Sequence, residues 1–536
     1  MTRAPYPAEE LQRLFAPERI AIVGVSSRET SFGARFVQNL AHFEGTVDLI
    51  NPKYGELHGR PCHPSLSALG ARPDCVVVAT DLSTVEPIFE ECIAVGAGGV
   101  VMIASGFAET GEAETVAVQS RLARRAAESG VKLVGPNTIG FVNFARKAGA
   151  TFMTGLNLER GYGLAGEDRR IGFVSQSGAL GFAFGQAMER GVGFSHVLTC
   201  GNSADVNVAD CVSYLIEDPS TRAIACLVEG MADPRQIEAV TRRATAAGKP
   251  LVLYKMAKGE EGARAAASHT GNLAGSHDAW RTMVERAGGI FADGVETMLE
   301  VVQFLAKAPP PTGPGAVVIA TSGGAAIMAA DAAEEFGVPL PQPNADVTAT
   351  LKARIPHFGS ARNPCDVTAQ VLNDTASFTE CAEAVLGQED FGTLVVPHVL
   401  AYATSVPRIA LLNELAASAG KPIILTWHSG WLEGPGALEA EAAPHLGLFR
   451  SVDNCFRTLA LWQRWHARQP DQPAGRVSTP PPRTRCARAS RGGARSPSAR
   501  RRRCCRPTGF PSSTSGAPRA RRRRGQRPRR SPARWS

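Results

Sequence analysis

Three stretches of the sequence share one pattern, in which an apolar strand enters a turn rich in glycine and serine and a helix begins at that turn. They read IAIVGVSSRETSFGARFVQNL (20–40), IGFVSQSGALGFAFGQAMERGVGF (171–194) and AVVIATSGGAAIMAADAAEEFGVPL (316–340). Short apolar strands that alternate with amphipathic helices are typical of parallel sheets covered by helices on both faces. The pattern therefore predicts an α/β protein built from doubly wound parallel sheets.

The first stretch begins a series of predicted strands. Further apolar runs occur at 47–51, 75–80, 98–105 and 131–135, separated by helical segments such as TVEPIFEECIAVG. This alternation predicts a Rossmann-like domain over residues 1–145.

The second and third stretches resemble copies of each other. Each is followed by NxxDV, at 202–206 and 363–367, and then by KPLVLYK (249–255) or KPIILTW (421–427). Three landmarks in the same order indicate an internal duplication. We predict two repeated domains, at 150–305 and 312–466, joined by the linker APPPTGPG (308–315).

The net charge of +8 comes from the C-terminal segment. From Gln472 onward there are 20 Arg but no Lys, Asp or Glu, so the preceding body carries 38 basic and 50 acidic residues, a net charge of −12. The segment 471–536 also lacks Leu, Ile and Met, which predicts a disordered tail. One interpretation is a nucleic-acid-binding arm. The other, which the composition favours, is a reading frame shifted near residues 470–475.

Composition excludes several other classes. No run approaches 18 apolar residues, and the N-terminus lacks the order of a signal peptide, so we predict a soluble cytoplasmic protein without a membrane segment. The 12 cysteines include no CxxC pair and no cluster with metal-ligand spacing, so no metal site or disulfide framework is predicted.

The turn VGVSSRETSFG (23–33) is a candidate phosphate site. A strand that ends in glycine before a helix exposes backbone NH groups to a phosphate-bearing ligand. The turn is not GxGxxG, and the next strand ends in Asn51, Pro52 and Lys53 where an NAD site has an acid, so ordinary NAD binding is disfavoured. Lys53 would suit a phosphate. A βα turn without a ligand is the alternative.

The turn SQSGAL (175–180) is a second candidate. Two hydroxyl side chains and a glycine at a helix N-terminus offer hydrogen-bond donors and the positive end of the helix dipole to a phosphoryl group. A plain serine N-cap explains the same residues.

His269 lies in SHTGNLAG (268–275), a stretch of small residues that predicts an accessible loop. The other half of the duplication has no matching histidine, so the repeat does not require it. Glu229 ends a predicted strand, and a carboxylate bonded to one ring nitrogen leaves the other nucleophilic. A phosphorylated imidazole would explain this loop, whereas a structural or solvated histidine is the ordinary alternative.

Together these motifs resemble the NDP-forming acyl-CoA synthetases, the superfamily of succinyl-CoA synthetase and of ADP-forming acetate-CoA ligases. The resemblance covers about residues 10–466 and depends on SHTGNLAG, SQSGAL and GPNTIG (135–140), with IASGFAETG (103–111) similar to a loop near the thioester. It implies an N-terminal Rossmann-like domain that binds coenzyme A and two flavodoxin-like domains.

The resemblance also implies roles for individual residues. His269 would be the phosphohistidine and Glu229 its orienting carboxylate. The phosphate cradle would be Ser175, Gln176, Ser177 and Gly178. The coenzyme A site would be Gly24, Ser26, Ser27, Lys53, Val78, Ala79 and Asn137.

The implied reaction is that of an acid-thiol ligase, which converts acyl-CoA, phosphate and ADP into a carboxylic acid, CoA and ATP. This chain would supply only the CoA and phosphohistidine half of an oligomer. ADP or ATP with Mg²⁺ would bind an ATP-grasp domain, either a separate β subunit or a fused domain lost by disruption of the gene. Alternatives are a catalytically incomplete or regulatory CoA-binding protein, or a nucleic-acid binder through the tail.

Overall fold

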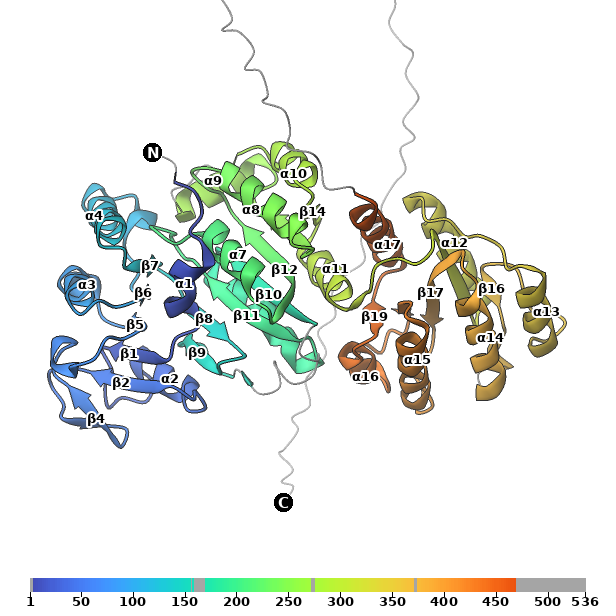
Figure 1. The fold of residues 1–536 in the computed structure, drawn as a ribbon, viewed down its shortest axis with the longest axis horizontal. Coiled ribbons are helices and arrows are strands. Elements are labelled where there is room, and N and C mark those ends of the chain that lie inside the picture. The colour runs from blue at the N-terminus through green and yellow to red at the C-terminus, as the bar shows by residue number, and fades with distance from the viewer. Residues whose placement is uncertain (1–2, 156, 159–168, 271–274, 371–373, 469–536) are drawn as a thin grey trace, which may run out of the picture. The chain divides into compact units, whose positions relative to one another are not determined.

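The computed structural model describes residues 3–155, 157–158, 169–270, 275–370 and 374–468, and for residues 267–270 it describes the backbone alone. The chain divides into two compact units, Met1–Gln472 and Pro473–Ser536, and every described residue belongs to the first. The predicted tail at 471–536 lies outside the described residues. Three β-sheets with flanking helices organise the first unit (Figure 1).

The first sheet has the strand order β3-β4-β2-β1-β5-β6-β7, and each neighbouring pair except β3 with β4 is parallel. Its strands are β1 (Arg19–Val23), β2 (Thr46–Ile50), β3 (Glu56–Leu57), β4 (Arg60–His63), β5 (Cys75–Val78), β6 (Gly99–Met102) and β7 (Lys132–Val134). The helical segments are α1 (Ala8–Phe15), α2 (Phe32–Asn39), η1 (Ser67–Leu69), η2 (Leu82–Thr84), α3 (Val85–Ala94), η3 (Ala108–Thr110) and α4 (Ala113–Ser129). All five predicted strands are present, and β5 and β6 are fully buried, as in sheets covered on both faces.

The second sheet has the order β14-β13-β12-β10-β11-β8-β9. Its strands are β8 (Gly140–Asn143), β9 (Ala148–Thr151), β10 (Arg170–Ser175), β11 (Phe194–Thr199), β12 (Thr221–Val228), β13 (Leu251–Lys255) and β14 (Ile290–Phe291). The helical segments are α6 (Gly178–Gly185), η4 (Gln186–Arg190), α7 (Val208–Glu217), α8 (Arg235–Ala246), α9 (Glu260–Thr270), α10 (His277–Arg286) and α11 (Val295–Lys307). Strands β10 to β14 pair in parallel, whereas β8 and β9 form an antiparallel edge.

Strand β8 belongs to the second sheet, although residues 1–145 were predicted to form the first domain. It pairs with β11, and its residues Phe141 and Val142 are fully buried. The Thr138 hydroxyl also donates to the Thr199 carbonyl oxygen at 2.7 Å. The chain therefore passes from the first sheet to the second between Val134 and Gly140, before the predicted boundary.

The third sheet has the order β16-β15-β17-β18-β19, all in parallel. Its strands are β15 (Gly315–Ala320), β16 (Cys365–Asp366), β17 (Phe391–His398), β18 (Ile423–Trp427) and β19 (Leu446–Phe449). Its helices are α12 (Gly323–Phe336), α13 (Ala345–Arg354), α14 (Thr375–Gly387), α15 (Ser405–Ala419), α16 (Ala437–Ala442) and α17 (Val452–Ala467). The order β14-β13-β12-β10-β11 of the second sheet matches β19-β18-β17-β15-β16 of the third, which supports the predicted duplication.

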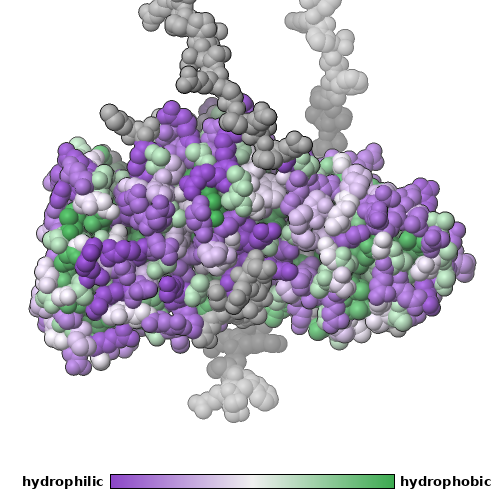
Figure 2. Space-filling model, in the orientation of Figure 1, coloured by the Kyte–Doolittle hydropathy of each residue, from purple (hydrophilic) through white to green (hydrophobic). Residues whose placement is uncertain are grey.

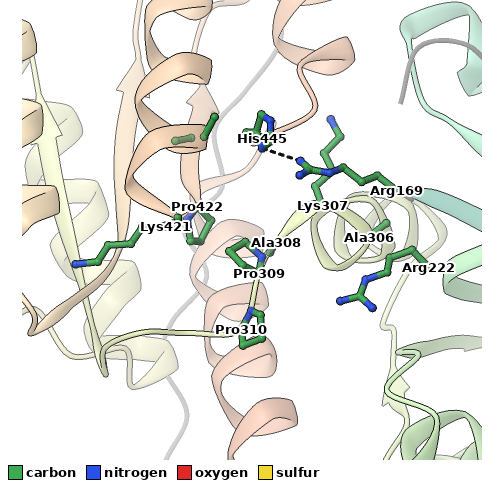
Figure 3. Close-up of a pocket in the computed structure, with 13 residues that line it drawn as sticks. Arg169, Arg222, Ala306, Lys307, Ala308, Pro309, Pro310, Lys421, Pro422 and His445 are labelled. Carbon is green, nitrogen blue, oxygen red and sulfur yellow. Dashed lines mark hydrogen bonds between the residues drawn. The ribbon is translucent and has the colours of Figure 1, made fainter. Parts of the chain in front are cut away.

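A cavity of about 380 Å³ lies beside the segment that joins α11 to β15, and basic side chains surround it (Figure 3). Lys307 donates to the carbonyl oxygens of Glu441 and Ala443, both at 2.8 Å. Lys421 donates to two further carbonyl oxygens, at the end of α14. Because carbonyl groups at helix ends lack partners within their own helix, these bonds account for the two lysines structurally.

Hydrophobic residues are dispersed over the surface visible in Figure 2, and the described cysteines lie inside the fold. The face shown in Figure 2 is mainly hydrophilic, with hydrophobic residues in small groups. All nine cysteines of the described residues are buried, and none of them forms a disulfide bond with another. Within the same residues, no helix is long and apolar enough to cross a membrane, and no group of three His, Cys, Asp or Glu could hold a metal ion.

The N-terminal segment is anchored on the second sheet's domain by Asp210, whose side chain is fully buried at the start of α7. Its two carboxylate oxygens accept a bidentate pair of hydrogen bonds from Arg3, both at 2.7 Å. The same carboxylate accepts from the backbone NH of Tyr6 at 2.7 Å and of Asn207 at 2.8 Å. Asp210 therefore ties the beginning of the chain to the N-terminus of α7.

We expect Asp210→Ala to lower the free energy of unfolding by about 2–3 kcal/mol, because it leaves a cation and two partly buried NH groups without their acceptor. Arg3 is one-third exposed and can regain water, which limits the loss. Urea denaturation measures the change. Glu238→Ala, which breaks the exposed Arg242 pair on α8, is the control and should cost less than about 0.5 kcal/mol. Equal losses for both variants would contradict the anchoring role of Asp210.

Candidate functional site

The turn between β10 and α6 holds the four residues predicted to cradle a phosphate. Ser175 is the last residue of β10, and its buried hydroxyl donates to the Ser177 carbonyl oxygen at 2.6 Å. The Gln176 amide nitrogen donates to the Gly230 carbonyl oxygen at 2.9 Å, and its oxygen accepts from the backbone NH of Glu229 at 2.9 Å. Ser175 thus shapes the turn, and Gln176 joins it to the end of β12.

Ser177 and Gly178 begin α6. Ser177 is the N-cap, and within the described structure its side chain makes no capping hydrogen bond. A Cβ atom on Gly178 would lie 2.6 Å from Ile139 Cγ1, so a larger residue at this position would require the Ile139 side chain to shift. The first-turn NH groups of α6 and the positive end of its dipole remain available for an anion at this end of the helix.

Glu229 follows β12 directly, as predicted, and is only 7% exposed. Because β10 and β12 are parallel neighbours, with Ser175 opposite Leu227, the residues that follow both strands meet at one edge of the sheet. The structure therefore brings Ser175, Gln176, Ser177 and Gly178 together with Glu229.

Lys255 belongs to the same edge and was missed by the sequence analysis. It ends β13 opposite Val228, is fully buried, and donates to the Met256 carbonyl oxygen at 2.6 Å. Burial lowers the pKa of Lys255 to about 8, although the nearby charge of Glu229 acts in the opposite direction. In the sequence, a lysine at a strand end ordinarily indicates a charge exposed to solvent. The register of β12 with β13 is needed to place Lys255 beside Glu229.

The buried Lys255 predicts a specific dependence of stability on pH. Its pKa is about 8 in the folded chain and has the ordinary value of 10.5 when unfolded. Between these values the unfolded chain binds more protons, so the wild type should gain up to about 1.4 kcal/mol per pH unit relative to Lys255→Met. Urea denaturation of both proteins at pH 8, 9 and 10 measures this difference. A constant difference would show that Lys255 keeps an ordinary pKa.

His269 lies in α9 and not in the predicted loop. The backbone is helical from Glu260 to Thr270, and the side chains of 267–270 and all of residues 271–274 are outside the description. The prediction of a loop was wrong for residues 268–270 because EEGARAAASHT is rich in residues of high helix propensity. Helix α9 contacts η3, in the IASGFAETG segment. The distance from the imidazole to Ser177 and Glu229 stays a prediction.

The predicted coenzyme A residues of the first sheet gather at the ends of β1, β2 and β5. Gly24 has φ +93°, and a Cβ there would lie 2.6 Å from the Ala79 carbonyl oxygen, which requires glycine. Ala79 follows Val78, the buried last residue of β5. The turn after β1 is therefore in close contact with the end of β5.

The predicted coenzyme A site also includes the polar side chains of Ser26, Ser27 and Lys53. The Ser26 hydroxyl donates to the Ser31 hydroxyl at 3.0 Å, and Ser27 is exposed. The Asn51 amide donates to the Val25 carbonyl oxygen at 2.7 Å and accepts from the Lys53 backbone NH at 2.9 Å, which leaves the Lys53 side chain exposed. This arrangement offers exposed donors at the edge where parallel sheets bind phosphate-bearing ligands.

Asn137 connects this edge with the second sheet. It has φ +57°, and its amide donates to the Asn202 amide oxygen at 3.2 Å. The Asn202 amide nitrogen donates to Glu109 at 2.5 Å and to Gln119 at 2.9 Å. Burial raises the pKa of Glu109, but the hydrogen bonds from Asn202 and from the Gly106 backbone outweigh it and lower the pKa overall. Asn202 had been identified only as a landmark of the duplication, so its role at this junction was missed.

Two segments of the chain match known domain families. Residues 18–143 match the CoA binding domain, and residues 168–305 match the succinyl-CoA ligase like flavodoxin domain. The matches cover the strands of the first two sheets except β9, together with the predicted coenzyme A residues, the cradle and His269.

Relatives along most of the chain are acyl-CoA ligases by name. The chain is 37% identical over 421 residues to acetate-CoA ligase [ADP-forming] I of Archaeoglobus fulgidus, covering 78% of this chain and 58% of the relative. It is 29% identical over 475 residues to the alpha subunit of acetate-CoA ligase [ADP-forming] I of Pyrococcus furiosus, covering 86% and 100%. The chain thus spans less than two thirds of the Archaeoglobus protein and the full length of the Pyrococcus subunit.

The fold has a solved counterpart. The dinucleotide forming acetyl-coenzyme A synthetase 1 of Ca. Korarchaeum cryptofilum, in complex with phosphate and ADP, superposes with a TM-score of 0.75 and 28% identity, covering 85% of this chain and 97% of that one. The two domain matches, the named relatives and the solved structure indicate the same family. The chain belongs to the succinyl-CoA synthetase alpha-like superfamily of NDP-forming acyl-CoA synthetases.

Proposed function

We propose that this chain is the CoA and phosphohistidine half of an acid-thiol ligase, which converts acyl-CoA, phosphate and ADP into a carboxylic acid, CoA and ATP. The observation that carries the proposal is the Gln176 amide, which bonds to the backbone of Glu229 and Gly230 beside the N-terminus of α6. A carboxylate and a site for an anion are thereby held at one sheet edge. Its relatives are ADP-forming ligases by name, which supports the reaction class.

The first step makes an acyl phosphate. A phosphate oxygen attacks the thioester carbonyl carbon, the carbon–sulfur bond breaks, and CoA leaves as a thiol with the proton that the phosphate gives up. The NH groups at Ser177 and Gly178 would stabilise the phosphate charge in the transition state. Gly24, Ser26, Ser27, Lys53, Val78, Ala79 and Asn137 would hold coenzyme A.

The second step moves the phosphoryl group to His269. One ring nitrogen attacks phosphorus, the bond to the acyl oxygen breaks, and the carboxylate leaves. The other ring nitrogen keeps its proton and would donate a hydrogen bond to Glu229, which fixes the tautomer and stabilises the positive charge that develops. Lys255, buried beside Glu229, would place a second polar group next to that carboxylate.

The third step requires a partner of the ATP-grasp type. A terminal oxygen of ADP attacks phosphorus, the phosphorus–nitrogen bond breaks, and ATP leaves with the neutral imidazole restored. Mg²⁺ would bind with the nucleotide in that partner. Two relatives from Pyrococcus furiosus are alpha subunits by name, which supports a separate subunit as the source of this domain.

The test is labelling of the chain itself. Incubation with acetyl-CoA, other acyl-CoA thioesters and ³²P-phosphate should give a label that is labile in acid, stable in alkali and located in the peptide that contains residues 268–275. A chain that binds CoA but takes no label with any thioester would instead be a regulatory or incomplete CoA-binding protein, and the proposal would be wrong.

A further inference from the structure

A groove of about 660 Å³ lies between the first two sheets' domains, beside the proposed site. One wall comes from α4 and η3, and the other comes from the loops that precede α7 and follow β12. Six of the residues that line it are Val116, Gln119, Ala123, Gln176, Asn202 and Met231. A volume of this size is typical of small-molecule sites.

The α4 wall of the groove carries no charge. Val116, Gln119, Ser120 and Ala123 line it at helical spacing and so share one face of the helix. Two of the arginines of α4 lie on another face, where Arg121 and Arg125 pair with Glu86 and Glu90 of α3. Val116, an apolar residue that is 39% exposed, faces this groove.

The opposite wall also disfavours an anionic ligand. Gly230, Met231 and Asp233 line it after the end of β12. Arg3 is the only cation among the described residues that line the groove, and both oxygens of Asp210 bind its guanidinium. A negatively charged ligand would therefore find no strong partner, whereas an uncharged and partly apolar one would fit.

The position of the groove connects the two halves of the proposed site. Asn202 lines it and accepts from Asn137 of the proposed coenzyme A site. Gln176 and Gly230 line it next to Glu229. The segment η3 contributes Ala108 to the same wall and contacts α9, the helix of His269.

We propose that this groove binds the acyl group of the thioester and selects uncharged acyl groups much larger than acetyl, with an aliphatic or aromatic body. The inference rests on the proposed function and adds the substrate class. The reacting carbonyl would lie near Gln176 and Glu229, and the body of the acyl group would extend between Val116, Ala123 and Met231. Each additional methylene buried there should raise kcat/KM about fourfold.

The test uses tryptophan to fill the groove. Ala123→Trp and Val116→Trp are compared with Ala127→Trp, which lies one turn further along α4, is exposed and does not line the groove. The kcat/KM for ³²P labelling is measured with acetyl-, hexanoyl- and benzoyl-CoA. For the wild type we expect hexanoyl- and benzoyl-CoA to be preferred. In the two groove variants the preference for hexanoyl- and benzoyl-CoA over acetyl-CoA should fall at least about 30-fold. In Ala127→Trp this preference should be the same as in the wild type.

Two results would overturn the inference. An equal loss for all three thioesters in the groove variants would show that the groove holds the pantetheine arm, and an unchanged preference would show that the acyl group lies elsewhere. Calorimetric binding of hexanoyl-CoA and acetyl-CoA to the unphosphorylatable His269→Gln variant, with and without Ala123→Trp, tests the groove even without labelling. The absence of label from the wild type with every thioester would refute the proposed function separately.

Discussion

His269→Gln is expected to reduce phosphoryl labelling of the chain by at least about 10⁴-fold, because it removes the nucleophile that accepts the phosphoryl group. Glutamine keeps a similar volume and a polar end, so α9 and the affinity for coenzyme A should be retained. Labelling by ³²P-phosphate and acyl-CoA, followed over time and normalised to bound coenzyme A, measures the effect.

His277→Gln is the matched control, because His277 is a second histidine close in sequence. It begins α10, and its ring packs edge-on against Phe291 with centroids 5.1 Å apart. We expect this variant to be labelled as the wild type is. A label that persists in His269→Gln, or that is lost in both variants, would contradict the assignment of His269.

Glu229→Gln is expected to slow labelling about 10³-fold, the next largest effect. A neutral amide cannot stabilise the imidazolium charge that develops as His269 attacks, and its NH₂ group favours the wrong ring tautomer. The backbone NH of Glu229 would still donate to Gln176, so the turn should keep its geometry. Single-turnover labelling at saturating acyl-CoA separates this chemical defect from weaker binding.

The control for this variant is Glu260→Gln, which neutralises an exposed carboxylate at the start of α9. It should label at nearly the wild-type rate. If Glu229→Gln also labels at that rate, Glu229 does not orient the histidine. If Glu229→Gln loses coenzyme A affinity in proportion to its rate, the carboxylate acts in binding.

The sequence was sufficient for the features that depend on local pattern. Apolar runs of strand length, followed by glycine and serine at the helix start, located β1, β10 and β15 and the turns after them. The pairing of Glu229 with the SQSG turn was also predictable in outline, because parallel strands present their carboxyl ends at one edge.

Features that depend on register between distant strands could not be predicted. The two bonds of Gln176 to the end of β12 require the alignment of Ser175 with Leu227. Lys255 is a candidate only because β13 aligns with Val228. The helix at His269 was missed for a different reason: the alanines were interpreted, like the glycines, as small residues of a loop, although alanine has the highest helix propensity.

The early crossing of the chain from β7 to β8 has a consequence for recombining parts of such proteins. The chain leaves the first sheet at Val134. At Gly140 it begins β8, which pairs with β11 at the antiparallel edge of the second sheet. A chimera joined after β9 would take β8 and β9 from one parent and β11 from the other, and a poor fit between them would expose the rim of β11 to edge-to-edge aggregation. Exchange of the coenzyme A module between relatives therefore has its natural junction between Val134 and Gly140, where both sheets stay whole.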